Sequence, residues 1–202
     1  MSPSPGPPGE LVAAVAALRA GLVVGVPTDT VYGLAADPTR PGATDRLFSL
    51  KSRPATSELP VLVAGTGQAE WFAAISGPAR VLAERFWPGG LTIVVARREG
   101  IDWSLGGDGQ TVGVRCPAHE LTRALCALVG PLATTSANRH GETPLTEAGA
   151  VRNAFGAAVA GVLDGGRCDG EPSTVVDVSG GTARCLRQGS VSWEEVTDAL
   201  GS

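Results

Sequence analysis

Residues 22–34 read LVVGVPTDTVYGL, an apolar run that changes abruptly into a polar turn. The apolar part, residues 22–26, is typical of a buried strand. The turn, residues 27–34, carries two threonines, an aspartate and the chain's single tyrosine. Because open α/β sheets bind ligands outside the carboxyl ends of their strands, we expect these side chains to line a site. The alternative is a capping turn, in which Thr28 or Asp29 binds free backbone N–H groups.

The same order of apolar strand and polar loop recurs along the chain. Further strands are expected at residues 59–64, 91–97, 111–116, 132–135, 158–163, 175–178 and 183–186. Helices are expected at residues 10–20, 43–50, 68–75, 78–87, 120–129, 146–155 and 193–200. Strands alternate with helices, but residues 91–97 and 111–116 have the pattern of an antiparallel pair joined by a glycine-rich connection. These features predict an α/β fold with a mixed sheet.

The composition describes a globular chain. Its 202 residues are 43% hydrophobic and 18% charged, and 16 basic against 20 acidic side chains give a net charge of −4. We expect a flexible tail at residues 1–9 and one domain over residues 10–202. The negative charge argues against a protein that mainly coats nucleic acid. The tail lacks the features of a signal peptide and residues 11–27 are too interrupted to span a membrane, so we expect a cytoplasmic protein.

The four cysteines show no CxxC pair, and the chain has only two histidines. The usual structural zinc spacings are therefore absent from the sequence. We expect buried free thiols and no metal ligands among these side chains.

Lys51 is the only lysine among sixteen lysine and arginine residues, and it stands two positions before Arg53. A lysine ammonium is a compact point charge that suits phosphate oxygens, whereas arginine presents a planar fork. This arrangement is compatible with an anion site. The alternative is compositional drift that left one surface lysine, and composition by itself favours neither interpretation.

Other polar residues follow or lie within the expected strands. Arg115 shares one face of its strand with Thr111 and Gly113, because side chains alternate along a strand. The sequence has no phosphate-binding P-loop, no GxGxxG, no GxSxG and no HExxH motif. A nucleophile at Ser136 is weakly supported, because His140 has no evident carboxylate partner. The remaining cations and hydroxyls suit the binding of a polyanion, as phosphoryl or nucleotidyl transfer requires.

Seven motifs together resemble the YrdC family of threonylcarbamoyl-AMP synthases, in family order over residues 27–189. They are PTDTVYGL (27–34), Lys51-x-Arg53-Pro54, FWPG (86–89), VRCP (114–117), SAN (136–138), PSTVVD (172–177) and LRQG (186–189). The resemblance implies a twisted open sheet around a concave, positively charged cavity. It also implies the single-domain form of the family, without the extra C-terminal domain of longer members.

The resemblance implies a reaction in which L-threonine, bicarbonate or CO2, and ATP form L-threonylcarbamoyladenylate and pyrophosphate. The product would serve, through downstream threonylcarbamoyl-transferase proteins, to form N6-threonylcarbamoyladenosine in tRNA, and weak binding of tRNA is compatible with this role. Mg²⁺ would accompany ATP, bound mainly through phosphates and water, with Asp29 or Asp177 as candidate contacts.

The resemblance also implies roles for individual residues. Lys51 and Arg53 would hold the triphosphate and are the expected catalytic contacts, and no residue is expected to be a resident metal ligand. The remaining ATP contacts would be Thr111, Ser136, Asn138 and Arg187. L-threonine would be bound by Thr28, Tyr32, Arg115, Thr134 and Ser173, with Arg115 pairing its carboxylate. The simpler interpretations are that Ser173 and Thr174 only begin a strand, that Arg187 is a solvated charge, and that Phe86 and Trp87 are core residues.

The sequence departs from the family pattern at three positions. His140 replaces a serine, and Ser57 and Leu62 occupy places where many members carry a lysine or a histidine. These changes would weaken substrate binding or alter the substrate. Two other functions stay open: a non-catalytic RNA-binding module on the same fold, and a carbamoyl-adenylate-forming enzyme of hydrogenase maturation. The second lacks support, because the sequence shows none of the acylphosphatase-like and zinc-finger segments that accompany that domain.

Overall fold

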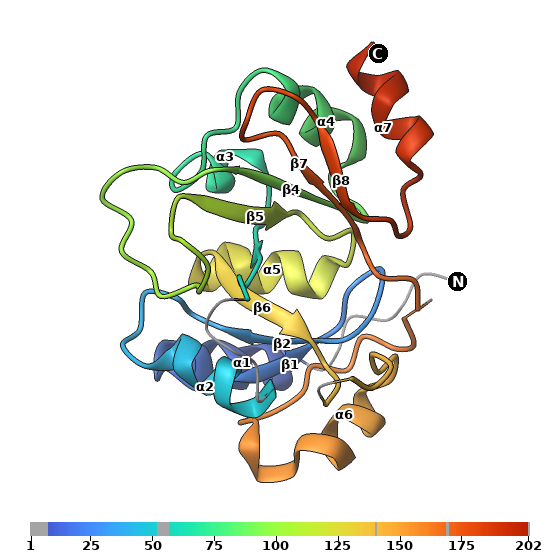
Figure 1. Cartoon of the computed structure of the whole chain (residues 1–202). Coiled ribbons are helices and arrows are strands. Elements are labelled where there is room, and N and C mark those ends of the chain that lie inside the picture. Colours follow the sequence, from blue (N-terminus) through green and yellow to red (C-terminus); the bar gives the residue numbers. More distant parts are fainter. Residues whose placement is uncertain (1–7, 52–56, 140, 169, 202) are drawn as a thin grey trace.

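A single mixed sheet organises the protein. The computed structural model describes residues 8–51, 57–139, 141–168 and 170–201. Within them, eight strands form one sheet in the order β1-β2-β6-β3-β5-β4-β7-β8 (Figure 1). The strands are β1 Val24–Val26, β2 Gly33–Ala36, β3 Val61–Leu62, β4 Leu91–Ala96, β5 Thr111–Arg115, β6 Leu132–Ser136, β7 Thr174–Asp177 and β8 Arg184–Arg187. The helices are α1 Pro8–Arg19, α2 Ala43–Lys51, α3 Thr66–Ala69, α4 Pro78–Phe86, α5 Glu120–Val129, α6 Ala148–Phe155, the 3-10 turn η1 Gly156–Ala158 and α7 Trp193–Leu200.

The pairing of the strands confirms the mixed sheet. β3 is parallel to β5 and β4 is parallel to β7, whereas the other neighbours are antiparallel. The antiparallel pair expected from residues 91–97 and 111–116 is present as β4 and β5. None of the described helices is long and apolar enough to cross a membrane.

The polar turn is shorter than the sequence predicted. Residues 33–36 form β2, which pairs with β1 on one side and β6 on the other. All four of its residues are buried. The sequence GLAA lacks the β-branched and aromatic residues that favour strands, so this strand depends on its two neighbours and not on local propensity.

Two other predicted elements were wrong in extent or type. Residues 158–163 do not form a strand, because η1 is followed by a single parallel bridge between Val162 and Gly25. The helix expected at residues 68–75 ends early as α3, because Ala73 forms an antiparallel bridge with Arg97 beyond the end of β4. On α1, Leu18 is buried whereas Val12 is exposed.

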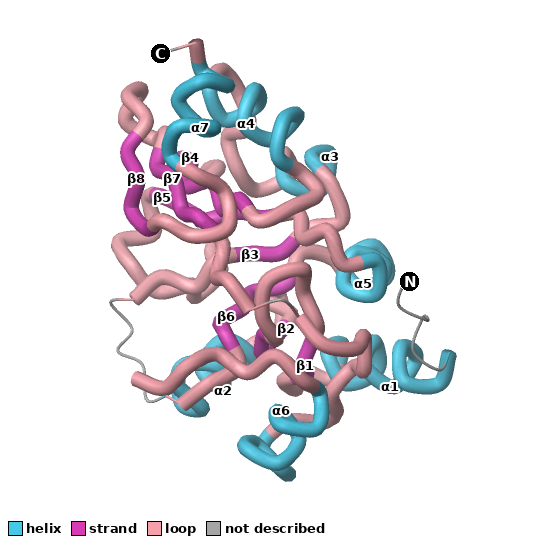
Figure 2. Tube along the Cα trace, turned by 90° about the vertical axis from the view of Figure 1, so that its right-hand side faces the viewer, coloured by secondary structure: helices cyan, strands magenta, loops and turns pink. Residues whose placement is uncertain are grey.

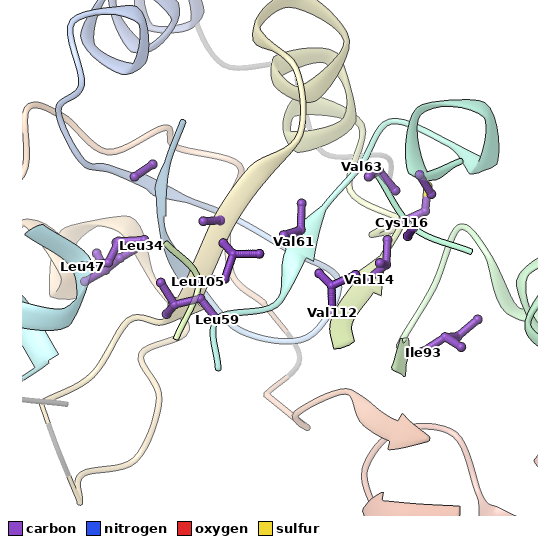
Figure 3. Close-up of a cluster of buried hydrophobic side chains, with 14 of the residues drawn as sticks. Leu34, Leu47, Leu59, Val61, Val63, Ile93, Leu105, Val112, Val114 and Cys116 are labelled. Atoms are coloured by element: carbon purple, nitrogen blue, oxygen red, sulfur yellow. The ribbon is translucent and has the colours of Figure 1, made fainter. Parts of the chain in front are cut away.

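One face of the sheet packs against the larger core. This core joins Leu47 of α2, Leu82 of α4 and Val196 of α7 to the buried side chains of the strands. Figure 3 shows Val61 of β3 and Val112 of β5 within this cluster. The alternate residues of the same strands therefore point to the opposite face.

The opposite face is covered by helices over only part of its width. Leu18 of α1 and Leu125 of α5 pack there against Val24 and Leu132 in a second, smaller core. Figure 2 shows α1 and α5 together on the side of the molecule away from β8. The side chains of β4, β5 and β7 on this face line a cavity.

Candidate substrate-binding site

The cavity has a volume of about 330 Å³ and its floor is the sheet itself. Side chains from the expected turn and from the end of β6 form one wall, and residues near β7 and β8 form the other. The described lining comprises Thr28, Thr30, Val31, Tyr32, Gly33, Glu58, Pro60, Leu62, Thr92, Val94, Gly113, Arg115, Thr134, Thr135, Ser136, Pro144, Pro172, Ser173, Val175, Leu186 and Arg187. Its charged members are two arginines and one glutamate.

Alternation along β5 places Arg115 as the sequence predicted. Val112 and Val114 are fully buried in the larger core. Gly113 and Arg115, on the other face, line the cavity. The charged residue within this strand therefore faces the candidate site and not the core.

Arg115 is held by three protein acceptors at the carboxyl end of β5. Its Nε donates to the carbonyl of Gly89 at 2.9 Å. Its Nη1 donates to the Thr30 hydroxyl and its Nη2 to the Asp29 carboxylate, both at 2.8 Å. Asp29 also accepts a hydrogen bond from the backbone N–H of Ala118 at 2.8 Å, just before α5. Burial lowers the pKa of Arg115, and the charge of Asp29 opposes that shift.

The FWPG motif contributes to this arrangement through its glycine. The Gly89 N–H donates to the Cys116 carbonyl at 2.8 Å, while its carbonyl accepts from Arg115. A Cβ at residue 89 would lie 2.5 Å from the backbone oxygen of Phe86, closer than real contacts allow. Phe86 and Trp87 pack against the larger core, as the simpler interpretation expected.

Ser173 and Arg187 meet at the opposite wall. The Ser173 hydroxyl lies 2.9 Å from the Thr92 hydroxyl. Arg187 donates to the Ser173 carbonyl through Nε at 3.0 Å and Nη2 at 2.8 Å, and Nη2 also reaches the Ser173 hydroxyl at 3.0 Å. Arg187 is thus exposed but bound to the protein, which differs from the solvated charge of the simpler interpretation.

The turn at residues 27–32 serves both of the roles considered for it. The Thr28 hydroxyl donates to the Val31 carbonyl at 2.7 Å and accepts from the Thr30 N–H at 3.1 Å, as a capping turn would. Thr28 and Tyr32 also line the cavity. The Tyr32 hydroxyl donates to the Gly166 carbonyl at 2.8 Å, and burial raises the pKa of Tyr32 to about 12.

Lys51 is buried at the end of α2, which excludes the interpretation as a surface lysine. Its Nζ donates to the Ser136 carbonyl at 2.9 Å. It also donates to the carbonyl and the side-chain Oδ1 of Asn138, both at 2.6 Å. The Ser136 hydroxyl donates to the same Asn138 Oδ1 at 2.6 Å. Lys51 therefore ties the end of α2 to the SAN loop that follows β6.

The predicted site residues separate into three groups. The cavity lining includes Thr28, Tyr32, Arg115, Thr134, Ser136, Ser173 and Arg187. Lys51, Thr111 and Asn138 stand outside the lining, although Lys51 and Asn138 are bonded to one another. Arg53 and His140 lie outside the described residues. Thr134, whose hydroxyl donates to the Leu34 carbonyl at 3.0 Å, shapes the wall.

The candidate magnesium contacts are both paired with arginines. Asp29 binds Arg115, and Asp177 lies 2.6 Å from Arg184. Hydrogen bonds from Ser179 and Arg184 lower the pKa of Asp177, against the opposing effect of burial. Within the described part of the chain, no three His, Cys, Asp or Glu side chains are grouped to hold a metal ion. Asp29 and Asp177 therefore each already have an arginine partner in the protein.

Glu58 is a lining residue that the sequence motifs did not indicate. Burial raises its pKa to about 7, and the charges of Asp108 and Asp177 act in the same direction. Arg97 and a hydrogen bond from the Thr111 hydroxyl oppose the shift. Because side chains alternate in extended backbone, residues 58, 60 and 62 lie on one face of the segment that leads into β3. This alternation is the sequence feature that could have indicated Glu58 as a lining residue. Leu62, one of the departures from the family pattern, lines the cavity from the same face.

Comparison with known proteins identifies the family. A family model for Sua5, YciO and YrdC proteins, described as "Telomere recombination", matches residues 16–189. The chain belongs to the Sua5/YciO/YrdC family. A Mycobacterium tuberculosis member named "Putative threonylcarbamoyl-AMP synthase" is 39% identical over 193 residues, which cover 95% of this chain and 89% of that protein. The resemblance seen in the sequence motifs is thus confirmed.

Solved structures of this family share the fold. The structure of Pyrococcus abyssi Sua5 with L-threonine has a TM-score of 0.89 and 36% identity, and the match covers 95% of this chain. The chain spans 57% of that Sua5 protein. Escherichia coli YciO, at 21% identity and a TM-score of 0.85, supports the fold alone. The expected twisted, open α/β architecture of the Sua5/YciO/YrdC family is confirmed.

Proposed function

We propose that this protein is an L-threonylcarbamoyladenylate synthase, which condenses L-threonine, bicarbonate or CO2, and ATP into threonylcarbamoyl-AMP and pyrophosphate. The observation that carries the proposal is the buried Arg115 guanidinium, held in a fixed orientation at one end of a cavity of about 330 Å³. The proposal is supported by the relatives named threonylcarbamoyl-AMP synthases and by the relative solved with L-threonine.

Arg115 provides the threonine carboxylate with a partner. Its contacts to Gly89, Thr30 and Asp29 each use one N–H group, and a guanidinium has five. The two N–H groups outside these contacts suit a carboxylate. Hydroxyl groups nearby, among them that of Ser173, suit the polar amino acid. Thr28, Tyr32 and Thr134 complete the wall of this proposed threonine subsite.

The nucleotide is assigned to the remaining part of the cavity. Ser136 and Arg187 line it, and Lys51 and Asn138 are bonded to one another beside Ser136. Thr111 begins β5, the strand whose Gly113 lies in the cavity lining. We assign the triphosphate to Lys51 and Arg53, with Lys51 acting from beneath the SAN loop that it anchors. ATP enters as its Mg²⁺ complex, in which the metal neutralises the departing pyrophosphate.

The chemistry needs orientation more than a reactive side chain. The threonine amine adds to CO2 to give an N-carboxylate and releases a proton. One carboxylate oxygen then attacks the α-phosphorus of ATP, the bond to the bridging oxygen breaks, and pyrophosphate leaves. Holding three reactants in line is worth up to about 7 to 11 kcal/mol of the barrier in favourable cases. We propose that downstream proteins use the product to form N6-threonylcarbamoyladenosine in tRNA.

The direct test is pyrophosphate release from ATP, measured with and without L-threonine and bicarbonate. We expect release that depends on both, and protein that releases no pyrophosphate in response to threonine would contradict the synthase proposal. The RNA-binding module is less favoured, because the net charge is −4 and the cavity has the size of a small-molecule site.

Lys51→Arg tests the assignment of the lysine in the same assay. A planar guanidinium cannot reproduce three bonds that converge on one nitrogen, so buried acceptors in the SAN loop would lose their donors. We expect a loss of stability of about 1–3 kcal/mol and at least a tenfold loss of pyrophosphate release. Arg46→Lys, on the exposed face of α2, is the control. Full activity in Lys51→Arg would contradict the assignment of Lys51 to the triphosphate.

A further inference from the structure

Glu58 marks the end of the cavity that lies away from Arg115. In the parallel pair of β3 and β5, Val61 is opposite Val114, so the same register continued backwards brings Glu58 beside Thr111. The hydrogen bond between the Thr111 hydroxyl and the Glu58 carboxylate agrees with this placement. Thr111 and Arg115 are four residues apart on one strand, roughly 13 Å at the usual rise. A threonine bound to Arg115 does not extend that far.

The floor between these two ends is low at a glycine and largely apolar around it. Gly113 stands midway between Thr111 and Arg115 and has no side chain, and Pro60 and Val94 flank it in the lining. A Cβ at residue 113 would lie 3.4 Å from Cγ2 of Thr92 and 3.5 Å from the Cβ of Pro60, so the glycine keeps the floor low between the side chains of the two neighbouring segments. Apolar surfaces with a polar group at the edge suit planar heterocycles. The polar group at this edge is Glu58.

We propose that Glu58 binds the Watson–Crick edge of the adenine of ATP and thereby sets the base specificity of the enzyme. This inference rests on the proposed function, because it takes ATP as the nucleotide. A neutral carboxyl group has one O–H donor and one carbonyl acceptor. These match adenine, whose N1 accepts and whose N6 amino group donates. Guanine offers two donors, N1–H and the N2 amino group, which match an ionised carboxylate instead.

The charges around Glu58 allow both the protonated and the ionised carboxyl group near neutral pH. Burial raises its pKa to about 7, with Asp108 in the β4–β5 connection and Asp177 on β7 adding to the effect. Arg97, after β4, and the Thr111 hydroxyl on β5 favour the ionised form. Asp102 in turn acts on Arg97. Preference for adenine is therefore expected below about pH 7 and is expected to weaken above it.

The test is calorimetric binding of ATP and GTP, as magnesium complexes, at pH 6 and pH 8.5. The wild-type protein is expected to bind ATP at least about tenfold more weakly at the higher pH and to lose much of its preference over GTP. Glu58→Gln is expected to keep ATP binding at both pH values, because its amide presents the same donor and acceptor pair as the neutral acid. Glu58→Ala is expected to lose roughly tenfold in affinity for ATP, equivalent to ~1.4 kcal/mol.

Glu84→Gln, an exposed change on α4 with the same loss of charge, is the matched control. Since the phosphates of ATP also titrate in this range, the decisive quantity is the ratio of affinities between the Glu58 variants and Glu84→Gln at each pH. Thermal melts establish that each protein is folded. If Glu58→Ala does not fold, the pH dependence of ATP binding in Glu58→Gln tests the assignment of Glu58.

The outcomes separate the inference from the proposed function. If the wild-type protein neither binds ATP nor releases pyrophosphate, the proposed function itself fails. If it does both while Glu58→Gln keeps the ATP affinity, GTP selectivity and pH profile of Glu84→Gln, the assignment of Glu58 is wrong. A rise in the KM for L-threonine in Glu58→Ala, with ATP binding equal to that of Glu84→Gln at both pH values, would likewise overturn it, by assigning the carboxyl group to the threonine end.

Discussion

At the scale of single residues, the ion pair of Arg115 and Asp29 organises the proposed threonine end of the cavity. Asp29 connects three parts of the chain, because it lies in the turn after β1, pairs with Arg115 of β5 and accepts a hydrogen bond from Ala118, just before α5. The Asp29 carboxylate accepts one N–H of the Arg115 guanidinium, the group that we propose binds the carboxylate of L-threonine. Asp29 is therefore a positioning residue and a local counter-charge in the absence of substrate.

Asp29→Asn is expected to lower the free energy of unfolding by about 2 kcal/mol. The amide can still accept the hydrogen bond from Ala118, but the buried guanidinium of Arg115 loses its compensating charge. Urea unfolding measures the change, with Asp45→Asn on the exposed side of α2 as the control. An unchanged midpoint for Asp29→Asn would mean that the pair contributes no net stability.

Glu58 is expected to make stability depend on pH. Its pKa is about 7 in the folded protein and 4.5 normally, so the folded state binds the proton more tightly. The contribution to stability is full below about pH 4.5 and is lost as the pH rises through about 7. Melting temperatures from pH 4.5 to pH 8 should show Glu58→Gln equal to the wild type at the acid end and more stable at pH 8. Parallel curves would contradict the shift in pKa.

At the scale of elements, β8 is held against the start of β7 by a close backbone approach at the LRQG motif. The Gly189 N–H donates to the Thr174 hydroxyl at 2.9 Å. A Cβ at residue 189 would lie 2.1 Å from the carbonyl oxygen of Pro172. The glycine therefore permits the approach that lets Arg187 bind Ser173.

Gly189→Ala is expected to cost about 1–3 kcal/mol, because the obstruction is backbone that cannot rotate away. Displacement of β8 should also raise the KM for ATP, since Arg187 belongs to the proposed nucleotide site. Gly180→Ala is the matched control, because a Cβ there meets no atom within 4 Å. Equal stability of the two variants, measured by denaturant unfolding, would show that the β7–β8 approach is adaptable.

The elements also show how far the sequence predicts the fold. α5 was predicted to the residue, because its apolar periodicity and its terminal glycine agree. β2 was missed, because its four small residues carry no strand signal and are ordered by β1 and β6. The segment at residues 158–163 has the apolar composition of a strand but supplies core side chains next to β1.

At the scale of the whole molecule, the two cores leave one cysteine accessible. Cys116, Cys126 and Cys168 are buried, whereas Cys185 is exposed on β8. Burial raises the pKa of Cys116 and of Cys126, which reduces their reactive thiolate further.

A thiol reagent such as DTNB is expected to modify one cysteine rapidly in the native protein and all four in urea. Cys185→Ser should abolish the rapid phase and leave the total in urea at three. Rapid modification of a second thiol in the native protein would show that one of the cores opens readily.

The sequence by itself determined the family, most of the elements and seven of the residues that line the cavity. It did so because turns, caps and period-2 strands are local and leave local patterns. The tertiary structure decided which of those residues meet. Asp29 lies 86 positions from Arg115, and Lys51 lies 87 from Asn138. Their pairing, and the place of Glu58 on the cavity floor, follow from how distant strands align in one sheet, which no local pattern encodes.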